Sequence, residues 1–206
     1  APLPFVTIST VGPALMSHGS ALQKDRFLPG IAAGEIHFAI GYSEPDAGSD
    51  LATLKTAAKV EPDGFVVNGN KLWTSGVEAA DFVWLAARTD PERPRHKGIS
   101  LLIVDTRTPG FSHTPIPTVG NSTAATYYDN VQVPREMLVG ELHGGWKLIT
   151  DQLNHERLGL GSWADKVFAP FRRVLLWAKA PDEQGRRAID QPWVRRALAD
   201  WKRSAR

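Results

Sequence analysis

Three polar segments of the sequence carry side chains whose types and spacing could do chemistry. The first, GYSEPDAGSD at residues 41–50, follows the apolar run IHFAI and combines glycines, hydroxyls and acids in a tight loop. The second is KLWTSG at residues 71–76, and the third is LNHERLGLG at residues 153–161. Hydrogen-bond donors, an aromatic face and a carboxylate are the groups that these segments could offer to a ligand.

The first segment could be a metal loop, a phosphate cradle or an ordinary turn. A calcium loop starting at Asp46 would need a glycine at Leu51 and a glutamate at Ala57, so no metal site is expected. No P-loop or dinucleotide-binding fingerprint is present. What remains is a capped turn, or a loop whose amides and hydroxyls, those of Ser43 and Ser49, donate to ligand oxygens.

The second segment places a tryptophan directly before two hydroxyls. Trp73 could cover a planar ring while Thr74 and Ser75 bond the edge of that ring. The alternative is that Trp73 is simply a core residue on one face of a strand. Sequence chemistry alone leaves both interpretations open.

The third segment is expected on a helix. Glu156 and Arg157 would point about 100° apart there and would not pair with each other, whereas Asp151 and His155 could form a surface pair. If Glu156 instead faced an apolar pocket, its pKa would rise and it could serve as a general base.

Composition bounds the class of protein that carries these segments. The 206 residues are 42 % hydrophobic and 22 % charged, as in a soluble globular protein, and no apolar run is long enough to span a membrane. No signal peptide is visible, and the absence of cysteine fits a reducing compartment. Residues 171–206 hold ten Lys or Arg against four Asp or Glu. Their paired arginines among tryptophans and leucines favour an amphipathic helix with a solvated face over nucleic-acid binding.

The pattern along the chain divides it into three blocks. Residues 1–35 are expected to end a helical domain, with the helix interrupted at Pro29–Gly30. Residues 36–135 alternate short apolar runs with turn signals, which predicts an antiparallel β-barrel or sandwich and an α+β fold overall. A turn is expected at residues 61–64, and Asn68–Gly69 lies between apolar residues as a hairpin turn does.

The third block, residues 136–206, is expected to begin a further helical domain. Pro134 ends a strand, and apolar residues then recur at helical spacing from residue 146 to residue 167. Gly185 and Pro192 mark a break, after which a second helix starts at about residue 192.

In this order the segments resemble the acyl-CoA dehydrogenase family. The resemblance covers nearly the whole chain and rests on QKDRFLPGIAAGE, FAIGYSEPDAGSD, VNGNKLWTSG, VPREMLVGE with GGW, and NHERLGLG. The acidic Pro-x-Ala-Gly-Ser-Asp loop, followed by the Lys-x-Trp-hydroxyl strand, is the specific combination. The family implies FAD as the cofactor and α,β-dehydrogenation of an acyl-CoA thioester as the reaction.

The resemblance also implies which residues form the site. Ser43 replaces the family's usual threonine beside the flavin and can make the same bond, and Trp73 covers the ring face. The implied cofactor contacts are Ile40, Gly41, Tyr42, Ser43, Gly48, Ser49, Trp73, Thr74 and Ser75. The implied substrate contacts are Ser49, Asn154, His155, Glu156 and Arg157.

Glu156 is a conditional candidate for the base that removes the proton α to the thioester carbonyl. Most family members place this glutamate in a later helix, beyond residue 206, and a minority place it at the position of Glu156. In many relatives a glutamate here merely accompanies the arginine.

The family further implies an acyl-CoA substrate, an electron-transfer flavoprotein or similar acceptor, and a homo-oligomer, usually a tetramer, or a hetero-oligomer. It suggests fatty-acid or lipid metabolism such as β-oxidation, in a bacterial cytoplasm or a mitochondrial matrix. Members have fuller helical domains on both sides of the β-domain, so this chain alone is expected to be an incomplete, inactive enzyme. The alternative is a non-catalytic barrel subunit that pairs with a catalytic partner.

Overall fold

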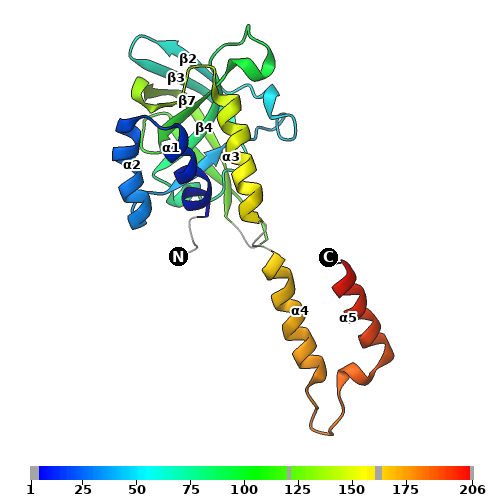
Figure 1. The fold of residues 1–206 in the computed structure, drawn as a ribbon. Helices are drawn as coiled ribbons and strands as arrows, with labels where there is room; N and C mark the ends of the chain where they lie inside the picture. The colour runs from blue at the N-terminus through cyan, green and yellow to red at the C-terminus, as the bar shows by residue number, and fades with distance from the viewer. Residues whose placement is uncertain (1–4, 120–121, 161–163, 205–206) are drawn as a thin grey trace. The chain divides into compact units, whose positions relative to one another are not determined.

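The computed structural model describes residues 5–119, 122–160 and 164–204, without the side chains of residues 155, 158–160, 164–168 and 204. The chain divides into two compact units, Ala1–Glu156 and Arg157–Arg206 (Figure 1). The expected three-domain division at residues 35 and 135 stays a prediction.

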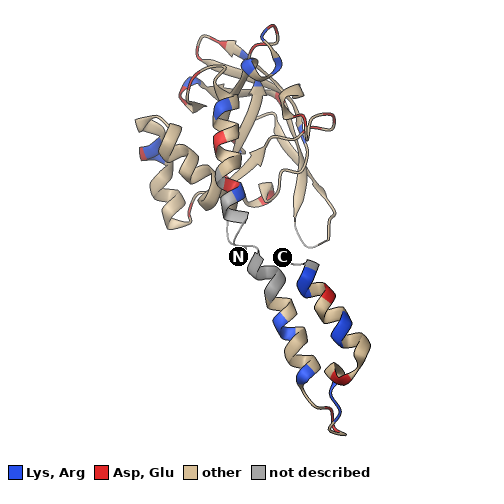
Figure 2. Cartoon of the chain, turned by 45° about the vertical axis from the view of Figure 1, so that its right-hand side comes forward, with Lys and Arg blue, Asp and Glu red and all other residues tan. Residues whose placement is uncertain are grey.

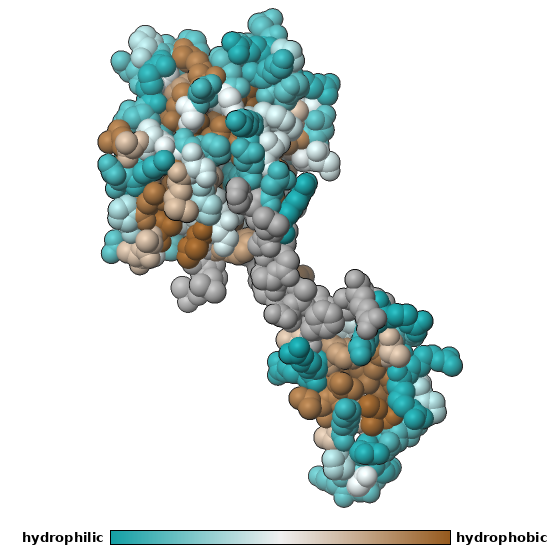
Figure 3. Space-filling model, in the orientation of Figure 1, coloured by the Kyte–Doolittle hydropathy of each residue, from teal (hydrophilic) through white to brown (hydrophobic). Residues whose placement is uncertain are grey.

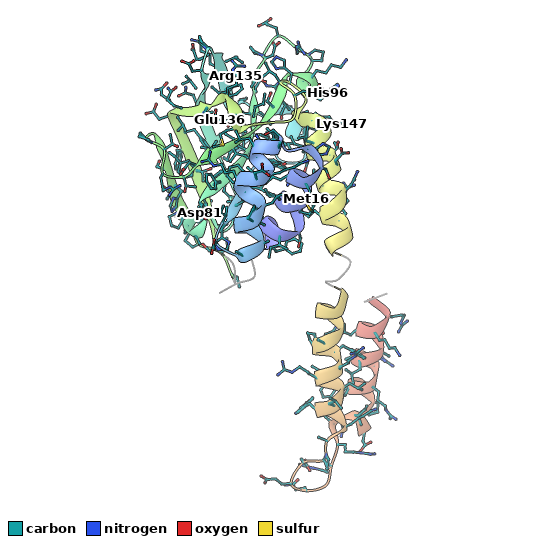
Figure 4. The ribbon with its side chains drawn as sticks, turned by 60° about the vertical axis from the view of Figure 1, so that its left-hand side comes forward. Met16, Asp81, His96, Arg135, Glu136 and Lys147 are labelled. Atoms are coloured by element: carbon teal, nitrogen blue, oxygen red, sulfur yellow. The ribbon has the colours of Figure 1, made fainter. Side chains whose placement is uncertain are left out.

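The first unit opens with helices, as expected for its first block. A π-helical turn, Thr7–Val11, leads into α1 (Gly12–His18), and α2 follows at Ala21–Ala33. Ser20 and Gln23 form a reciprocal capping box at the start of α2, which satisfies two backbone donors there. Figure 4 shows α1 and α2 side by side in front of the sheet.

The expected interruption at Pro29–Gly30 is wrong, because α2 runs through both residues to Ala33. Pro29 removes one helical hydrogen bond, to the carbonyl of Asp25. Asp25 and Pro29 are both exposed, so water can bond to the released carbonyl oxygen of Asp25. The helix ends instead at Gly34, whose φ of 74° is a left-handed conformation that glycine adopts readily.

An eight-stranded sheet follows, and most neighbouring strands in it are antiparallel. The strand order is β6-β7-β3-β2-β4-β5-β8, and β1 pairs with β4. The two parallel pairings are β1 with β4 and a single residue pair between β2 and β4. The strands are β1 (Phe38–Gly41), β2 (Ala57–Glu61), β3 (Gly64–Lys71), β4 (Phe82–Arg88), β5 (Ile99–Asp105), β6 (Phe111–Ile116), β7 (Thr123–Pro134) and β8 (Leu138–Val139). The expected fold class, a largely antiparallel β-domain flanked by helices, is confirmed.

The two turn signals had different outcomes. The turn at residues 61–64 is confirmed, since Glu61 pairs with Gly64 across a tight β2–β3 hairpin. Asn68–Gly69 is not a turn, because β3 continues to Lys71 and the register with β7 shifts between Val67 and Gly69. The pair therefore forms a β-bulge, which places an irregularity two residues before the end of β3.

The bulge makes Gly69 intolerant of a side chain. Its φ is 145°, and a Cβ there would lie 2.7 Å from the Cα of Thr56. We expect Gly69→Ala to lower the free energy of unfolding by about 1–3 kcal/mol, through backbone strain and the clash with Thr56. Urea unfolding measures this loss. Gly48→Ala is the control, since a Cβ at Gly48 meets nothing within 4 Å.

Aromatic side chains join the helices to the sheet. Phe27 of α2 contacts Phe38 of β1 and Phe82 of β4 edge-on, with ring centroids 5.6 and 5.1 Å apart. Phe38 in turn meets the fully buried Trp84 at 6.4 Å. The helix α3 (Gly145–Leu160) contributes Leu148 and Ile149 to the same core. β1 is thereby packed from its first residue, Phe38, against α2 and β4, in a core that α3 shares. This packing fixes where the chain enters the loop at residues 41–50.

The second unit is a helical hairpin of α4 (Ala164–Lys179) and α5 (Pro192–Ser204). The expected helix start at residue 192 is confirmed, while the helical run expected from residue 146 comprises two helices, α3 and α4. Residues 161–163 between them lie outside the described residues. The small core of the hairpin is built on Ala178, Val194 and Leu198.

The basic residues of this hairpin lie on its surface, as expected for an amphipathic helix (Figure 2). Arg172, Arg173, Arg195 and Arg196 are all exposed. Apolar side chains gather on one face of the same unit (Figure 3), and its exposed large apolar residues include Leu176, Trp177 and Trp193. Across the described helices of the chain, none is long and apolar enough to cross a membrane.

Candidate flavin and thioester site

The loop at residues 41–50 leaves β1 as a tight turn with an open tip. Glu44 and Ala47 exchange two backbone hydrogen bonds of 2.8 and 3.2 Å, which close the turn. Beyond it, Gly48 and Ser49 are exposed, and no atom lies within 4 Å of a Cβ built at Gly48. The tip can therefore be approached closely by a ligand, as a backbone cradle requires.

A buried ion pair joins this loop to the Trp73 strand. Lys71, the last residue of β3, is fully buried, and its Nζ lies 2.8 Å from Glu44 Oε1 and 3.0 Å from the Tyr42 carbonyl oxygen. The Leu72 amide also donates to the Ser43 carbonyl oxygen at 2.8 Å. The first two sequence segments are thus neighbours in the fold. Neither Lys71 nor Glu44 was among the predicted site residues.

Trp73 is not a core residue. Its side chain is 57 % exposed, and its φ of 63° is a left-handed conformation that is a genuine outlier for a bulky residue. The interpretation as strand core is therefore wrong. Because strained backbone collects at ligand sites, the open ring of Trp73 supports the interpretation as a cover for a planar ligand.

The two hydroxyls after Trp73 lie against β7. Thr74 is fully buried, its amide donates to the Ala124 carbonyl oxygen at 3.0 Å, and its Oγ1 lies 3.3 Å from Thr126 Oγ1. The Ser75 hydroxyl donates to Thr123 Oγ1 at 3.2 Å. These bonds hold the two residues after Trp73 on β7, and Lys71, two residues before it, pairs with Thr126 of the same strand. β7 therefore positions Trp73.

A second buried network joins the start of the loop at Tyr42 and the strand β4 to α3. The Trp84 indole donates to Gln152 Oε1 at 2.9 Å and to the Tyr42 hydroxyl at 3.1 Å, and that hydroxyl donates to Gln152. The Nε2 of Gln152 is buried without a partner among the described residues. Sequence reasoning missed Gln152 and Trp84. The available signal was the spacing of four between Gln152 and Glu156, which places both on one face of a helix.

Glu156 lies on the side of α3 that faces this network. Burial raises the pKa of the Tyr42 phenol far above its usual value, and the nearby negative charge of Glu156 adds to the rise. The Glu156 side chain is half-buried. Asn154 and Arg157 are exposed, and the side chain of His155 lies outside the described residues. Asp151, expected to pair with His155, lies 3.5 Å from His18 Nε2.

The Tyr42 hydroxyl is expected to contribute modestly to stability. Tyr42→Phe removes one donor to Gln152 and one acceptor for Trp84, so the free energy of unfolding should fall by about 1 kcal/mol. The remaining bond from Trp84 to Gln152 keeps the loss small. Urea unfolding compares this variant with Tyr127→Phe, whose exposed ring should give no change.

Two family models match the chain. That for the middle domain of acyl-CoA dehydrogenases covers residues 39–131, and that for their C-terminal domain covers residues 143–206. The chain belongs to the acyl-CoA dehydrogenase family of oxidoreductases.

Individual relatives agree with the family models. Acyl-CoA dehydrogenase FadE29 of Mycobacterium tuberculosis is 54 % identical over 201 residues, which are 97 % of this chain and 52 % of that protein. The solved ChsE4–ChsE5 complex of M. tuberculosis matches with a TM-score of 0.90 and 52 % identity, over 100 % of this chain and 54 % of that one. The solved Tcur3481–Tcur3483 steroid acyl-CoA dehydrogenase matches with a TM-score of 0.89 and 54 % identity, over 96 % of this chain and 50 % of that one. The chain thus spans about half the length of these relatives.

The residues present fit the FAD that the family typically binds. The exposed Trp73 ring offers a flat apolar face, and the open loop tip at Gly48 and Ser49 offers amide and hydroxyl donors. The buried, unpartnered Nε2 of Gln152 shows that donor capacity on this side of α3 is not used up by the described residues. Among those residues, no group of three His, Cys, Asp or Glu could hold a metal ion.

Proposed function

We propose that this protein takes part in the FAD-dependent α,β-dehydrogenation of an acyl-CoA thioester. The observation that carries the proposal is the meeting of the three segments: the buried Lys71–Glu44 pair joins the first loop to Trp73, and the Tyr42–Gln152 bond joins the same loop to the helix of Glu156. A donor loop, an open aromatic face and a carboxylate thereby belong to one compact unit.

Each part has a role that follows from its chemistry. The Glu156 carboxylate accepts the proton α to the thioester carbonyl. Backbone and hydroxyl donors of residues 43–49 hold anionic and carbonyl oxygens, while Trp73, Thr74 and Ser75 position the flavin ring. Bound FAD supplies the capacity to accept the β-hydride. Ile40, Gly41 and Tyr42 complete the lining on the β1 side, and Asn154, His155 and Arg157 complete the substrate side.

The relatives refine the substrate and the assembly. The Tcur3481–Tcur3483 protein is described as a steroid acyl-CoA dehydrogenase, and ChsE4–ChsE5 is a complex of two proteins. We infer for this protein a steroid-type thioester substrate and a place as one subunit of a hetero-oligomer, with an electron-transfer flavoprotein or a similar acceptor. A non-catalytic subunit that pairs with a catalytic partner is the second candidate, because the two different chains of a complex such as ChsE4–ChsE5 can have different roles.

A titration of the purified chain with FAD tests the proposal. We expect saturable quenching of tryptophan fluorescence together with a perturbed flavin absorbance spectrum. Trp73→Ala should weaken FAD binding by about ten-fold, since ring stacking is worth up to about 1.5 kcal/mol in addition to the apolar area that the ring buries. Trp193→Ala, in the second unit and 71 % exposed, is the matched control. Equal affinity of the Trp73 variant and the wild type would contradict the assigned cofactor face.

The chain alone is expected to turn over little or no acyl-CoA. It spans about half the length of its relatives, and the family resemblance implies fuller helical domains on both sides of the β-domain. A coupled dye-reduction assay with acyl-CoA measures this. Rapid turnover by the 206-residue chain would contradict the expectation.

A further inference from the structure

The Glu44–Lys71 pair is the most deeply buried ion pair among the described residues, and none of the roles above uses its charge. The exposed fractions of the two side chains are 6 % and 0 %. The Lys71 ammonium has two acceptors in the loop, Glu44 Oε1 and the Tyr42 carbonyl oxygen. Bonds of this kind, between charged groups or to a charged donor, are stronger than neutral ones and more demanding in geometry.

The same carboxylate also holds the entry to β2. Glu44 Oε2 accepts from the Lys55 amide at 2.6 Å, and Glu44 Oε1 accepts from the Thr56 amide at 2.8 Å. One carboxylate therefore connects three stretches of chain: the loop itself, residues 55–56, and the end of β3. Because the partners lie 11, 12 and 27 residues from Glu44, the carboxylate ties the loop to two segments that are distant from it in the sequence.

The protonation states support a charged pair at neutral pH. Burial opposes ionisation of Glu44, but the Lys71 ammonium and the bonds from Lys55 and Thr56 outweigh it and hold the pKa of the carboxyl below its usual value. Burial lowers the pKa of the Lys71 ammonium to about 8, so it is still protonated at pH 7.

Stability alone does not explain this pair. Two apolar residues of similar volume often stabilise a fold as well as a buried ion pair does, because two charges must be desolvated. What an apolar pair does not supply is directional bonds. Here the bonds from Lys71 end at Tyr42 and Glu44. Between these two residues, the Ser43 carbonyl oxygen accepts a hydrogen bond from the amide of Leu72, which precedes the strained Trp73.

We propose that Glu44 and Lys71 are positioning residues, which fix the loop at residues 42–50 against Trp73 and so set the affinity of the site for FAD. The inference rests on the proposed function for its ligand, but not for the ordering of the loop. A loop held in its binding conformation before the ligand arrives avoids the entropy cost of ordering. The ion pair thereby converts an exposed, glycine-containing turn into a preorganised cradle.

The test is the double variant Glu44→Gln/Lys71→Met, which keeps side-chain size and removes both charges. We expect a urea midpoint close to that of the wild type. Amides of residues 42–50 should exchange hydrogen at least ten-fold faster, with β4 and β5 unchanged, and Kd for FAD should rise at least ten-fold. The control is Glu61→Gln/Lys59→Met, which removes the charges of an exposed pair with a 2.6 Å contact on β2. The control should change neither the hydrogen exchange of the loop nor the Kd for FAD.

Each outcome decides a different point. Unchanged loop exchange in the folded double variant would overturn the positioning role, and faster exchange with an unchanged Kd would overturn its link to the cofactor. A wild type that binds no FAD would contradict the proposed function, while loop exchange would still decide whether the pair orders the loop. If the double variant does not fold, Glu44→Asp retains the charge on a shorter side chain and should show the same two changes to a smaller degree.

Discussion

Replacing Glu156 by glutamine is expected to lower kcat of the assembled enzyme by about 10²- to 10⁴-fold, the usual contribution of a general base. Glutamine keeps the shape of the side chain but cannot accept the proton α to the thioester carbonyl. The helix should stay in place, because Gln152, one turn earlier, still bonds to Trp84 and Tyr42. FAD binding should therefore be retained, which separates a lost base from a lost site.

The measurement is kcat and KM of the protein together with the second subunit that the proposed function assigns to it, and an FAD titration of each variant. Glu141→Gln, at an exposed carboxylate of the same unit, is the matched control and should leave kcat unchanged. Full activity of the Glu156 variant would show that the base lies elsewhere in the assembly. That result would favour the non-catalytic alternative for this chain.

Local signals in the sequence were sufficient for most of the fold. The turn at Glu61–Gly64, the end of β7 at Pro134 and the start of α5 at Pro192 each follow from one residue type in its preferred position. The hairpin turn predicted at Asn68–Gly69 was wrong because the same dipeptide suits both a hairpin turn and a β-bulge. Only the pairing with β7 distinguishes the two. The helix interruption predicted at Pro29 was wrong because the free-energy cost of a proline in a helix depends on whether water can reach the carbonyl that loses its hydrogen bond. That exposure is set by the tertiary structure.

The site was predictable in its segments but not in the bonds that join them. Trp73 was identified by its position before two hydroxyls, whereas its exposure and left-handed backbone required the structure. Lysine is a residue type expected on the surface, because it is seldom buried unless it is paired with an opposite charge. Nothing in the sequence therefore indicated that Lys71 is buried. Its partner Glu44 lies 27 residues away, so the pair follows from neither helical spacing nor strand alternation.

Lys71→Met is the variant expected to damage the fold most. It leaves the Glu44 carboxylate buried without its cation, and breaking a buried pair in this way typically costs about 3–5 kcal/mol of unfolding free energy. The single variant should therefore be much less stable at pH 7 than the double variant Glu44→Gln/Lys71→Met. This order, with two substitutions less harmful than one, distinguishes an unpaired charge from a simple loss of packing.

The loss should also depend on pH, in a direction set by Glu44. In the wild type its pKa is lowered, so its stabilising contribution is present above about pH 4.5, its ordinary value, and is lost as the pH falls below that. Without Lys71, burial raises the pKa of the same carboxyl. The variant therefore loses the destabilising buried charge as the pH falls and Glu44 takes up a proton. The stability gap between wild type and Lys71→Met should therefore narrow between pH 7 and pH 4 in urea unfolding. A gap that is equal at both pH values would mean that packing, and not the unpaired carboxylate, explains the loss.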